Sequence, residues 1–234
     1  MAINTILWDV DGTLLDFDLA ETNALRECMD RYHVAVSDTQ LMVYKRINRE
    51  LWEMLERGEI TKTRLGPERF RKFLEYMNHM QIDCNRLNEE YQEALSYQSI
   101  PVEGAIEICN ALQQKGIRQY IVTNGTAFVQ RRKIRLSGLD AYMEEVFISE
   151  ELGCVKPEKA FFEQCAARIA DYDPAQTIIV GDSLTSDMCG GNNAEIRCCW
   201  YNPGQQENTT EVRIDYEIRE LAQIPDCLAD AVDI

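Results

Sequence analysis

Four groups of polar side chains follow short apolar runs in this sequence. They are Asp9, Asp11, Gly12 and Thr13; Thr123, Asn124 and Gly125; Lys156 and Pro157; and, after Gly181, Asp182 and Asp187. Functional sites in parallel α/β sheets form at the carboxyl ends of the strands. We therefore expect two acidic pairs, a hydroxyl group and a lysine to meet at one edge of a sheet.

These residue types are suited to phosphoryl transfer. Converging carboxylates repel one another and need a neutralising charge. Oxygen ligands without His or Cys suit Mg²⁺, which we predict as the cofactor. Transfer of a phosphoryl group to a protein also needs an in-line nucleophile and a proton donor for the leaving oxygen. Each of these roles has a candidate among the four groups.

The apolar runs predict strands that are buried on both faces. They cover residues 5–8, 119–122, 146–148 and 177–180, with 197–201 as a fifth candidate. Helical spacing of apolar residues lies between them, as in 105–112, which Gly116 ends. Alternating strands and helices predict an α/β fold with a Rossmann-like parallel sheet.

Residues 17–97 have a different pattern. They show helical periodicity and many charges, without a convincing strand, and one helix is expected to end near Gly58. We expect an α/β core domain of residues 1–16 and 98–234, with a helical domain of residues 17–97 inserted after the first strand.

The four groups together resemble the four motifs of the haloacid dehalogenase (HAD) superfamily. The motifs are Asp9-Val10-Asp11-Gly12-Thr13, the Thr123-Asn124-Gly125 turn, Lys156-Pro157 and Gly181-Asp182 with Asp187. They occur in the family's order, each after a predicted strand, and the similarity extends from Ile6 to about Trp200.

The resemblance implies a role for each motif residue. Asp9 is similar to the nucleophile that becomes an aspartyl phosphate, and Asp11 to the general acid/base. Thr123 and Asn124 resemble the phosphate-binding element, and Lys156 the cation that restrains nucleophile and phosphate. Asp9, Asp11 (through its backbone carbonyl) and Asp182 resemble the Mg²⁺ ligands. Asp187 resembles a carboxylate that orients Lys156 or a metal-bound water, although it could instead cap a helix.

The position of residues 17–97 resembles the helical C1-type cap of this superfamily. Leu51-Trp52, Gly58 to Lys62 and Arg69-Phe70 are similar to the house-cleaning pyrimidine 5′-nucleotidases of that family. So are Phe147 to Ser149 and Gly190 to Ala194. This resemblance implies hydrolysis of pyrimidine nucleoside monophosphates. The expected substrate contacts in and next to the cap are Phe17, Asn48, Trp52, Arg64 and Arg69. Trp52 could equally belong to the cap's own core.

Other functions remain open on the sequence alone. A phosphatase for phosphoglycolate or a sugar phosphate, or a phosphomutase, would use the same four motifs. A non-enzymatic regulatory module would be favoured by loss of Asp9, Asp11 or Asp182, and all three are present.

The composition limits the classes of molecule that the protein is expected to bind. The formal net charge of −16 disfavours binding to nucleic acid or to anionic membranes. Nine cysteines without a CxxC pair indicate reduced thiols, and the N-terminus lacks a signal-peptide pattern. We expect a cytoplasmic monomer or homodimer whose partner is a small phosphorylated metabolite.

Overall fold

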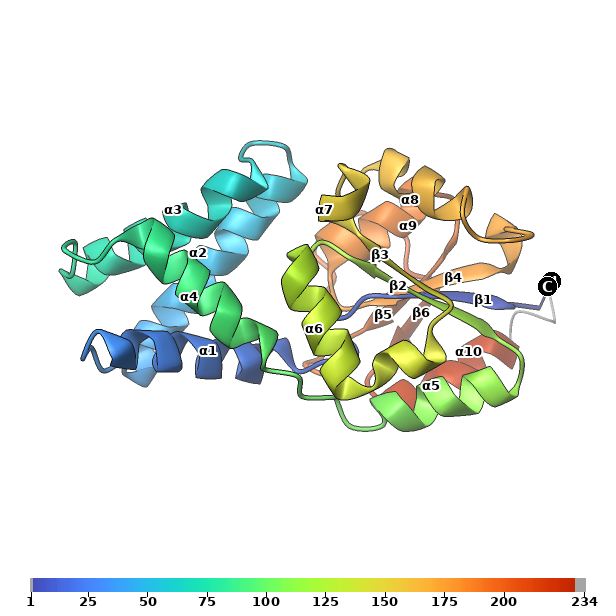
Figure 1. Ribbon diagram of the computed structural model, residues 1–234. Coiled ribbons are helices and arrows are strands. Elements are labelled where there is room, and N and C mark those ends of the chain that lie inside the picture. The colour runs from blue at the N-terminus through green and yellow to red at the C-terminus, as the bar shows by residue number, and fades with distance from the viewer. Residues whose placement is uncertain (1, 230–234) are drawn as a thin grey trace. The chain divides into compact units, whose positions relative to one another are not determined.

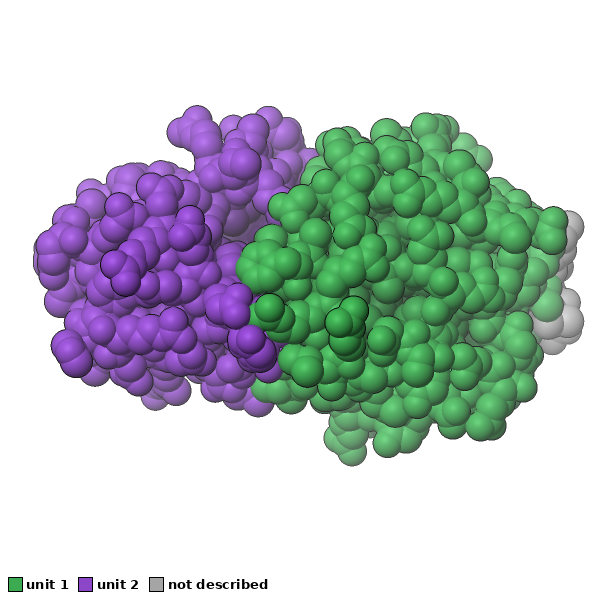
Figure 2. All heavy atoms as spheres, viewed as in Figure 1, with its two compact units in different colours: residues 1–17, 99–234 green, residues 18–98 purple. Residues whose placement is uncertain are grey.

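The computed structural model describes residues 2–229, which form two compact units. The described residues up to Phe17 and from Ser99 onward make up the first unit, and residues 18–98 make up the second (Figure 2). We call them the α/β unit and the helical unit.

The α/β unit is built on a six-stranded sheet whose paired strands are all parallel. Its strands are β1 (Thr5–Trp8), β2 (Arg118–Thr123), β3 (Glu145–Ile148), β4 (Thr177–Gly181), β5 (Arg197–Tyr201) and β6 (Tyr216–Ile218). Their order is β3-β2-β1-β4-β5-β6, so β1 lies between β2 and β4. The carboxyl ends of these three strands are therefore neighbours.

Helices cover both faces of this sheet (Figure 1). In β1, Ile6 and Trp8 point into one apolar core and Leu7 into the other, as the two-residue period of a strand requires. The first core is closed by α5 (Ala105–Gln114), α6 (Ala127–Ser137) and α10 (Ile224–Ala229). The second core is closed by α7 (Ser149–Leu152), α8 (Lys159–Ala166) and η3 (Leu184–Met188), a π-helical turn that leads into α9 (Cys189–Asn193). Short 3₁₀ turns complete the unit at η1 (Leu139–Tyr142), η2 (Pro174–Gln176) and η4 (Leu221–Gln223).

The helical unit is formed by α1 (Phe17–Arg31), α2 (Asp38–Glu56), α3 (Lys62–Met77) and α4 (Cys84–Ser96), with Phe17 itself in the α/β unit. Local signals set the helix boundaries. Ser37 and Gln40 form a capping box at the start of α2, and Gly58, with φ +72°, follows its end. The core of this unit is an aromatic cluster of Tyr44, Phe70, Phe73 and Tyr91.

The two chain segments that connect the units are paired with each other. The backbone N–H of Asp16 donates to Ile100 O at 2.8 Å, and that of Val102 donates to Leu14 O at 3.0 Å. Leu15 also bridges to Asp11 in the loop after β1. Both connections therefore start from the same edge of the α/β unit as Asp9 and Asp11.

The predicted α/β class with a parallel Rossmann-like sheet is confirmed, and so are its five expected strands, with ends shifted by at most one residue. The edge strand β6 was not expected. Within the described residues, no helix is both long enough and apolar enough to cross a membrane.

Candidate active site at the carboxyl edge of the sheet

Asp9 occupies the centre of the site because β1 is central in the sheet. It follows β1 directly, and its backbone N–H donates to Val180 O of β4 at 2.9 Å. Its carboxylate is buried and accepts a hydrogen bond from the Thr13 hydroxyl group at 3.3 Å.

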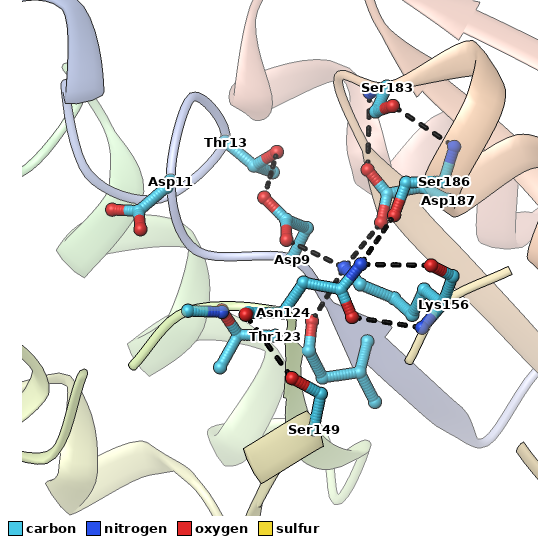
Figure 3. Close-up of polar contacts among 12 residues, drawn as sticks. Asp9, Asp11, Thr13, Thr123, Asn124, Ser149, Lys156, Ser183, Ser186 and Asp187 are labelled. Atoms are coloured by element: carbon cyan, nitrogen blue, oxygen red, sulfur yellow. Dashed lines mark hydrogen bonds and ion pairs between the residues drawn. The ribbon is translucent and has the colours of Figure 1, made fainter. Parts of the chain in front are cut away.

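Lys156 joins two carboxylates from distant parts of the chain (Figure 3). Its Nζ lies 2.7 Å from Asp9 Oδ1, 2.6 Å from Asp187 Oδ1 and 2.9 Å from Val122 O. These three partners satisfy all three ammonium hydrogens, which explains how a lysine can be 1% exposed. Asp187 lies inside η3, whose N-cap is Ser183, and its other oxygen accepts from the Ser183 N–H at 3.1 Å.

Burial and neighbouring charge shift the ionisation of this network. Burial raises the pKa of Asp9 to about 7; Lys156 opposes that rise, and Asp187 and Asp11 add to it. Burial also disfavours the charge on Lys156, but Asp187 and Asp9 outweigh it, so its pKa is raised and the ammonium form is retained. The site therefore holds a permanent cation against its nucleophile candidate.

Asp182 brings a third carboxylate to the same place. Oxygens of Asp9, Asp182 and Asp187 lie within 4.8 Å of one another, and Asp182 is the member that faces solvent. Desolvation by the surrounding protein raises the pKa of Asp182 well above its usual value, and the negative charges of Asp9 and Asp187 raise it further. Gly12 leaves room for this carboxylate, because a Cβ there would lie 2.5 Å from Asp182 Oδ2, and its φ of +94° also favours glycine.

This oxygen cluster fits a hard divalent cation. Asp9, Asp182 and Asp187 supply three carboxylates, and Lys156 supplies one compensating ammonium group. Two formal negative charges remain among these four residues, which matches the charge of one Mg²⁺ ion. The donor set, which contains oxygen atoms only, matches the preference of that ion.

The Asp11 carboxylate points away from Asp9 and Lys156 (Figure 3), and its partners lie on α6. Gln130 Nε2 donates to Asp11 Oδ2 at 2.5 Å, and the Lys133 ammonium group forms an ion pair with Asp11 Oδ1. The Asp11 side chain keeps a solvent-accessible part, whereas the Lys133 side chain is fully buried.

The turn after β2 is locked to the loop that carries Lys156. Asn124 Nδ2 donates to Lys156 O, and Asn124 Oδ1 accepts from Lys156 N, both at 2.9 Å. The Thr123 hydroxyl oxygen accepts from the Gly125 N–H at 3.2 Å, and Ser149 donates to Asn124 O at 3.2 Å. Thr123 and Lys156 are thereby fixed relative to each other.

The residues expected to contact substrate from the cap region have different environments. Asn48 and Arg69 are each 2% exposed, and they bond to each other at 3.2 Å inside the helical unit. Trp52 is half-buried and Arg64 exposed in that unit. Phe17 is half-buried, with its ring centroid 5.5 Å from Lys133 Nζ in the α/β unit. A substrate contact by any of these five residues stays a prediction.

Sequence reasoning missed Gln130 and Lys133. The two residues lie three positions apart on the buried face of the helix that follows the Thr123 turn, and the sequence alone does not show that this face is buried. A buried Lys requires a partner, and the structure identifies that partner as Asp11.

A parallel α/β sheet with clustered carboxylates and a buried lysine at its carboxyl edge is the arrangement of a phosphoryl-transferring hydrolase. The chain belongs to the haloacid dehalogenase-like hydrolase family, whose model matches residues 6–201.

Similar proteins span nearly the whole chain. Pyrimidine 5′-nucleotidase PynA of Streptococcus pneumoniae is 36% identical, over 95% of this chain and 94% of that protein. Pyrimidine 5′-nucleotidase YjjG of Escherichia coli is 30% identical, over 95% of this chain and 96% of that protein. The crystal structure of the HAD-hydrolase YfnB of Bacillus subtilis is described as bound to magnesium. It matches this structure with a TM-score of 0.93 at 35% identity, over 97% of this chain and 99% of that chain.

Proposed function

We propose that this enzyme is a Mg²⁺-dependent phosphatase that acts through an aspartyl phosphate on Asp9, with pyrimidine nucleoside 5′-monophosphates as substrates. The single observation that carries the proposal is the Asp9–Lys156–Asp187 network with Asp182 beside it. This network provides a nucleophile, a fixed cation and an excess of negative charge in one place.

In the proposed site, the Asp9 and Asp182 carboxylates and the backbone carbonyl of Asp11 would hold the metal ion. When bound, Mg²⁺ supplies positive charge that offsets the carboxylates and the charge on the phosphoryl oxygens. Asp187 and Lys156 contact each other at 2.6 Å, so Asp187 orients the ammonium group.

The reaction proceeds in two displacements. A carboxylate oxygen of Asp9 attacks phosphorus and forms the new O–P bond, while the bond from phosphorus to the ester oxygen breaks and Asp11 gives that oxygen a proton. Water then attacks the same phosphorus with Asp11 as base, and the carboxylate of Asp9 is regenerated. Thr123 and Asn124 bind the phosphate, and Lys156 limits the charge repulsion between Asp9 and the incoming phosphate.

The substrate class rests on the two relatives named as pyrimidine 5′-nucleotidases. We infer that residues 17–97 act as a cap that discriminates among phosphoesters. Two observations support this. Both connecting segments start at the edge of the sheet that carries Asp9 and Asp11, and the YfnB structure is described as revealing interdomain movement. A base held under such a cap could contribute binding energy in the transition state.

The test is phosphate release from dUMP, UMP and dTMP with Mg²⁺, compared with glucose 6-phosphate and phosphoglycolate. We expect release from the nucleotides, reversible loss of activity with EDTA, and inhibition by Ca²⁺, whose larger coordination number disturbs the attack geometry. Full activity in metal-free buffer would contradict the metal requirement. A clear preference for phosphoglycolate or a hexose phosphate would reject the nucleotidase assignment.

A further inference from the structure

The helix α6 presents two polar side chains to the interior of the α/β unit. Its buried residues are Val129, Gln130, Lys133 and Ile134, which share one face. Val129 and Ile134 are apolar, and Ile134 packs in the core of the sheet. Gln130 and Lys133 are as buried as these two, although both carry polar groups that are costly to dehydrate.

Both polar side chains end on Asp11. The amide of Gln130 donates to one carboxylate oxygen at 2.5 Å, and the ammonium group of Lys133 contacts the other oxygen. The Phe17 ring lies beside the Lys133 ammonium, with the ring centroid 5.5 Å from Nζ. Two donors on two oxygens fix both the position and the plane of a carboxylate, which one donor cannot do.

The approach of α6 to the catalytic loops is also tight. A Cβ at Gly125, in the turn after β2, would lie 2.0 Å from Gln130 Nε2. The Gln130 side chain therefore fills the space between the turn that carries Thr123 and the loop that carries Asp11. The Gln130 Oε1 atom is buried without a hydrogen-bond partner among the described residues. The contact that orients this amide is therefore the hydrogen bond from its Nε2 to Asp11.

We propose that Gln130 and Lys133 are positioning residues that aim the Asp11 carboxyl group at the ester oxygen of the substrate. This inference rests on the proposed phosphatase function. Each carboxyl oxygen has two acceptor positions, so Asp11 can keep its contacts with α6 while one oxygen carries a proton toward the leaving group. As the P–O bond breaks, that proton moves from Asp11 to the departing oxygen, and the electron pair of the broken bond stays on that oxygen.

Substrates with different leaving groups can show whether Gln130 and Lys133 position Asp11 or only stabilise the fold. A nucleoside leaves as an alkoxide and needs the proton, whereas p-nitrophenolate is stable without one. The parameter kcat/KM covers the steps up to formation of the aspartyl phosphate. If the Asp11 carboxyl group is displaced, kcat/KM should fall for nucleotides and change little for p-nitrophenyl phosphate. Hydrolysis of the aspartyl phosphate does not enter this parameter, so the later role of Asp11 as a base does not confuse the comparison.

The experiment measures kcat/KM for dUMP and for p-nitrophenyl phosphate in Lys133→Met, Gln130→Leu and the wild type. We expect each substitution to lower the value for dUMP by at least roughly tenfold, part of the full worth of a general acid. The value for p-nitrophenyl phosphate should stay within about threefold of the wild type, since this leaving group needs little protonation. Lys133→Arg should recover part of the dUMP rate, because it restores a cationic donor.

Two controls fix the interpretation. Ile134→Val alters packing on the same helix face and should change both substrates alike. In an Asp11→Asn background, Lys133→Met should cause almost no further loss on dUMP, because residues that act as a unit are not additive.

Equal losses on the two substrates, a gain on dUMP, or a full additional loss in the Asp11→Asn background would overturn the inference while leaving the phosphatase assignment in place. A wild-type protein without activity on any phosphoester would instead overturn the proposed function, and this inference with it.

Discussion

Two buried carboxylates in this protein have similar ionisation and different surroundings. Burial raises the pKa of Asp9 in the α/β unit to about 7, and it does the same for Glu21 in the helical unit. Glu21 accepts from Asn48 at 2.6 Å, and Asn48 in turn accepts from Arg69. The Arg69 guanidinium also bonds Asn88 and lies 4.6 Å from the Tyr91 ring centroid.

The difference lies in charge balance and access. Around Glu21 the charges balance, because Arg69 offsets the Glu21 carboxylate and the nearby Lys45 is paired with Asp18. Asp9 shares one buried lysine with Asp187, and Asp182 beside it faces solvent. A raised pKa alone therefore does not identify a catalytic carboxylate. Surplus negative charge beside a solvent-facing carboxylate, at the ends of adjacent strands, is the stronger indication of function.

The largest expected effect is on the nucleophile. Asp9→Asn should lower phosphate release by at least roughly 10³-fold, because an amide is a poor nucleophile and a weak metal ligand. The matched control is Glu21→Gln, which removes the other buried carboxylate and should leave kcat within about threefold, since it touches no reacting group. Near-normal turnover in Asp9→Asn would end the aspartyl-phosphate account.

Asp11→Asn should come next, with a loss of roughly 10²-fold or more in kcat for nucleotides, the usual worth of a general acid/base. The Asn side chain can still accept hydrogen bonds from α6 but cannot give a proton to the leaving oxygen. The measurement is steady-state phosphate release at saturating Mg²⁺. An unchanged kcat would show that another group supplies the proton.

Glu21 should affect stability through pH. Its folded-state pKa of about 7 lies above the unfolded value, so the unfolded chain loses the proton first as pH rises. Stability contributed by the protonated group is therefore lost between about pH 5 and pH 7, by roughly 2 kcal/mol. The charges of Arg69 and Lys45 oppose this rise in the pKa of Glu21, and the charge of Asp18 adds to it.

The measurement for this effect is urea unfolding of the wild type and Glu21→Gln across that pH range, without metal. The pH dependence should be shallower in the variant. Parallel curves for the two proteins would show that Glu21 does not titrate as described.

Much of the α/β unit could be predicted from sequence, because continuous apolar runs mark strands buried on both faces. The three-residue strand β6 could not, since Tyr216 and Glu217 give it no apolar run. The contacts of Asp11 with Gln130 and Lys133 join residues more than a hundred positions apart, so only the packing of α6 reveals them. Likewise, periodicity could not show that Arg69 faces inward in α3, because a charged residue is ordinarily expected on the solvent side.

Substrate preference should be the smallest effect. Pyrimidine nucleoside monophosphates should exceed glucose 6-phosphate in kcat/KM by at least roughly tenfold, about 1.4 kcal/mol. Trp52→Ala or Phe17→Ala should shrink that ratio and leave p-nitrophenyl phosphate hydrolysis within about threefold, if these rings stack on the base. A lower melting temperature with equal losses on all substrates would instead place Trp52 in the core of the helical unit.

The central claim is that Asp9 carries the phosphoryl group, and chemical trapping tests it most directly. Asp11→Asn would be mixed with p-nitrophenyl phosphate and Mg²⁺, quenched in acid, and reduced with borohydride. Borohydride converts an aspartyl phosphate to homoserine, which peptide mass spectrometry can locate. We predict homoserine at position 9, and none when Asp9→Asn is added. Product formation without any trapped residue, or with homoserine at Asp182 or Asp187, would contradict the account.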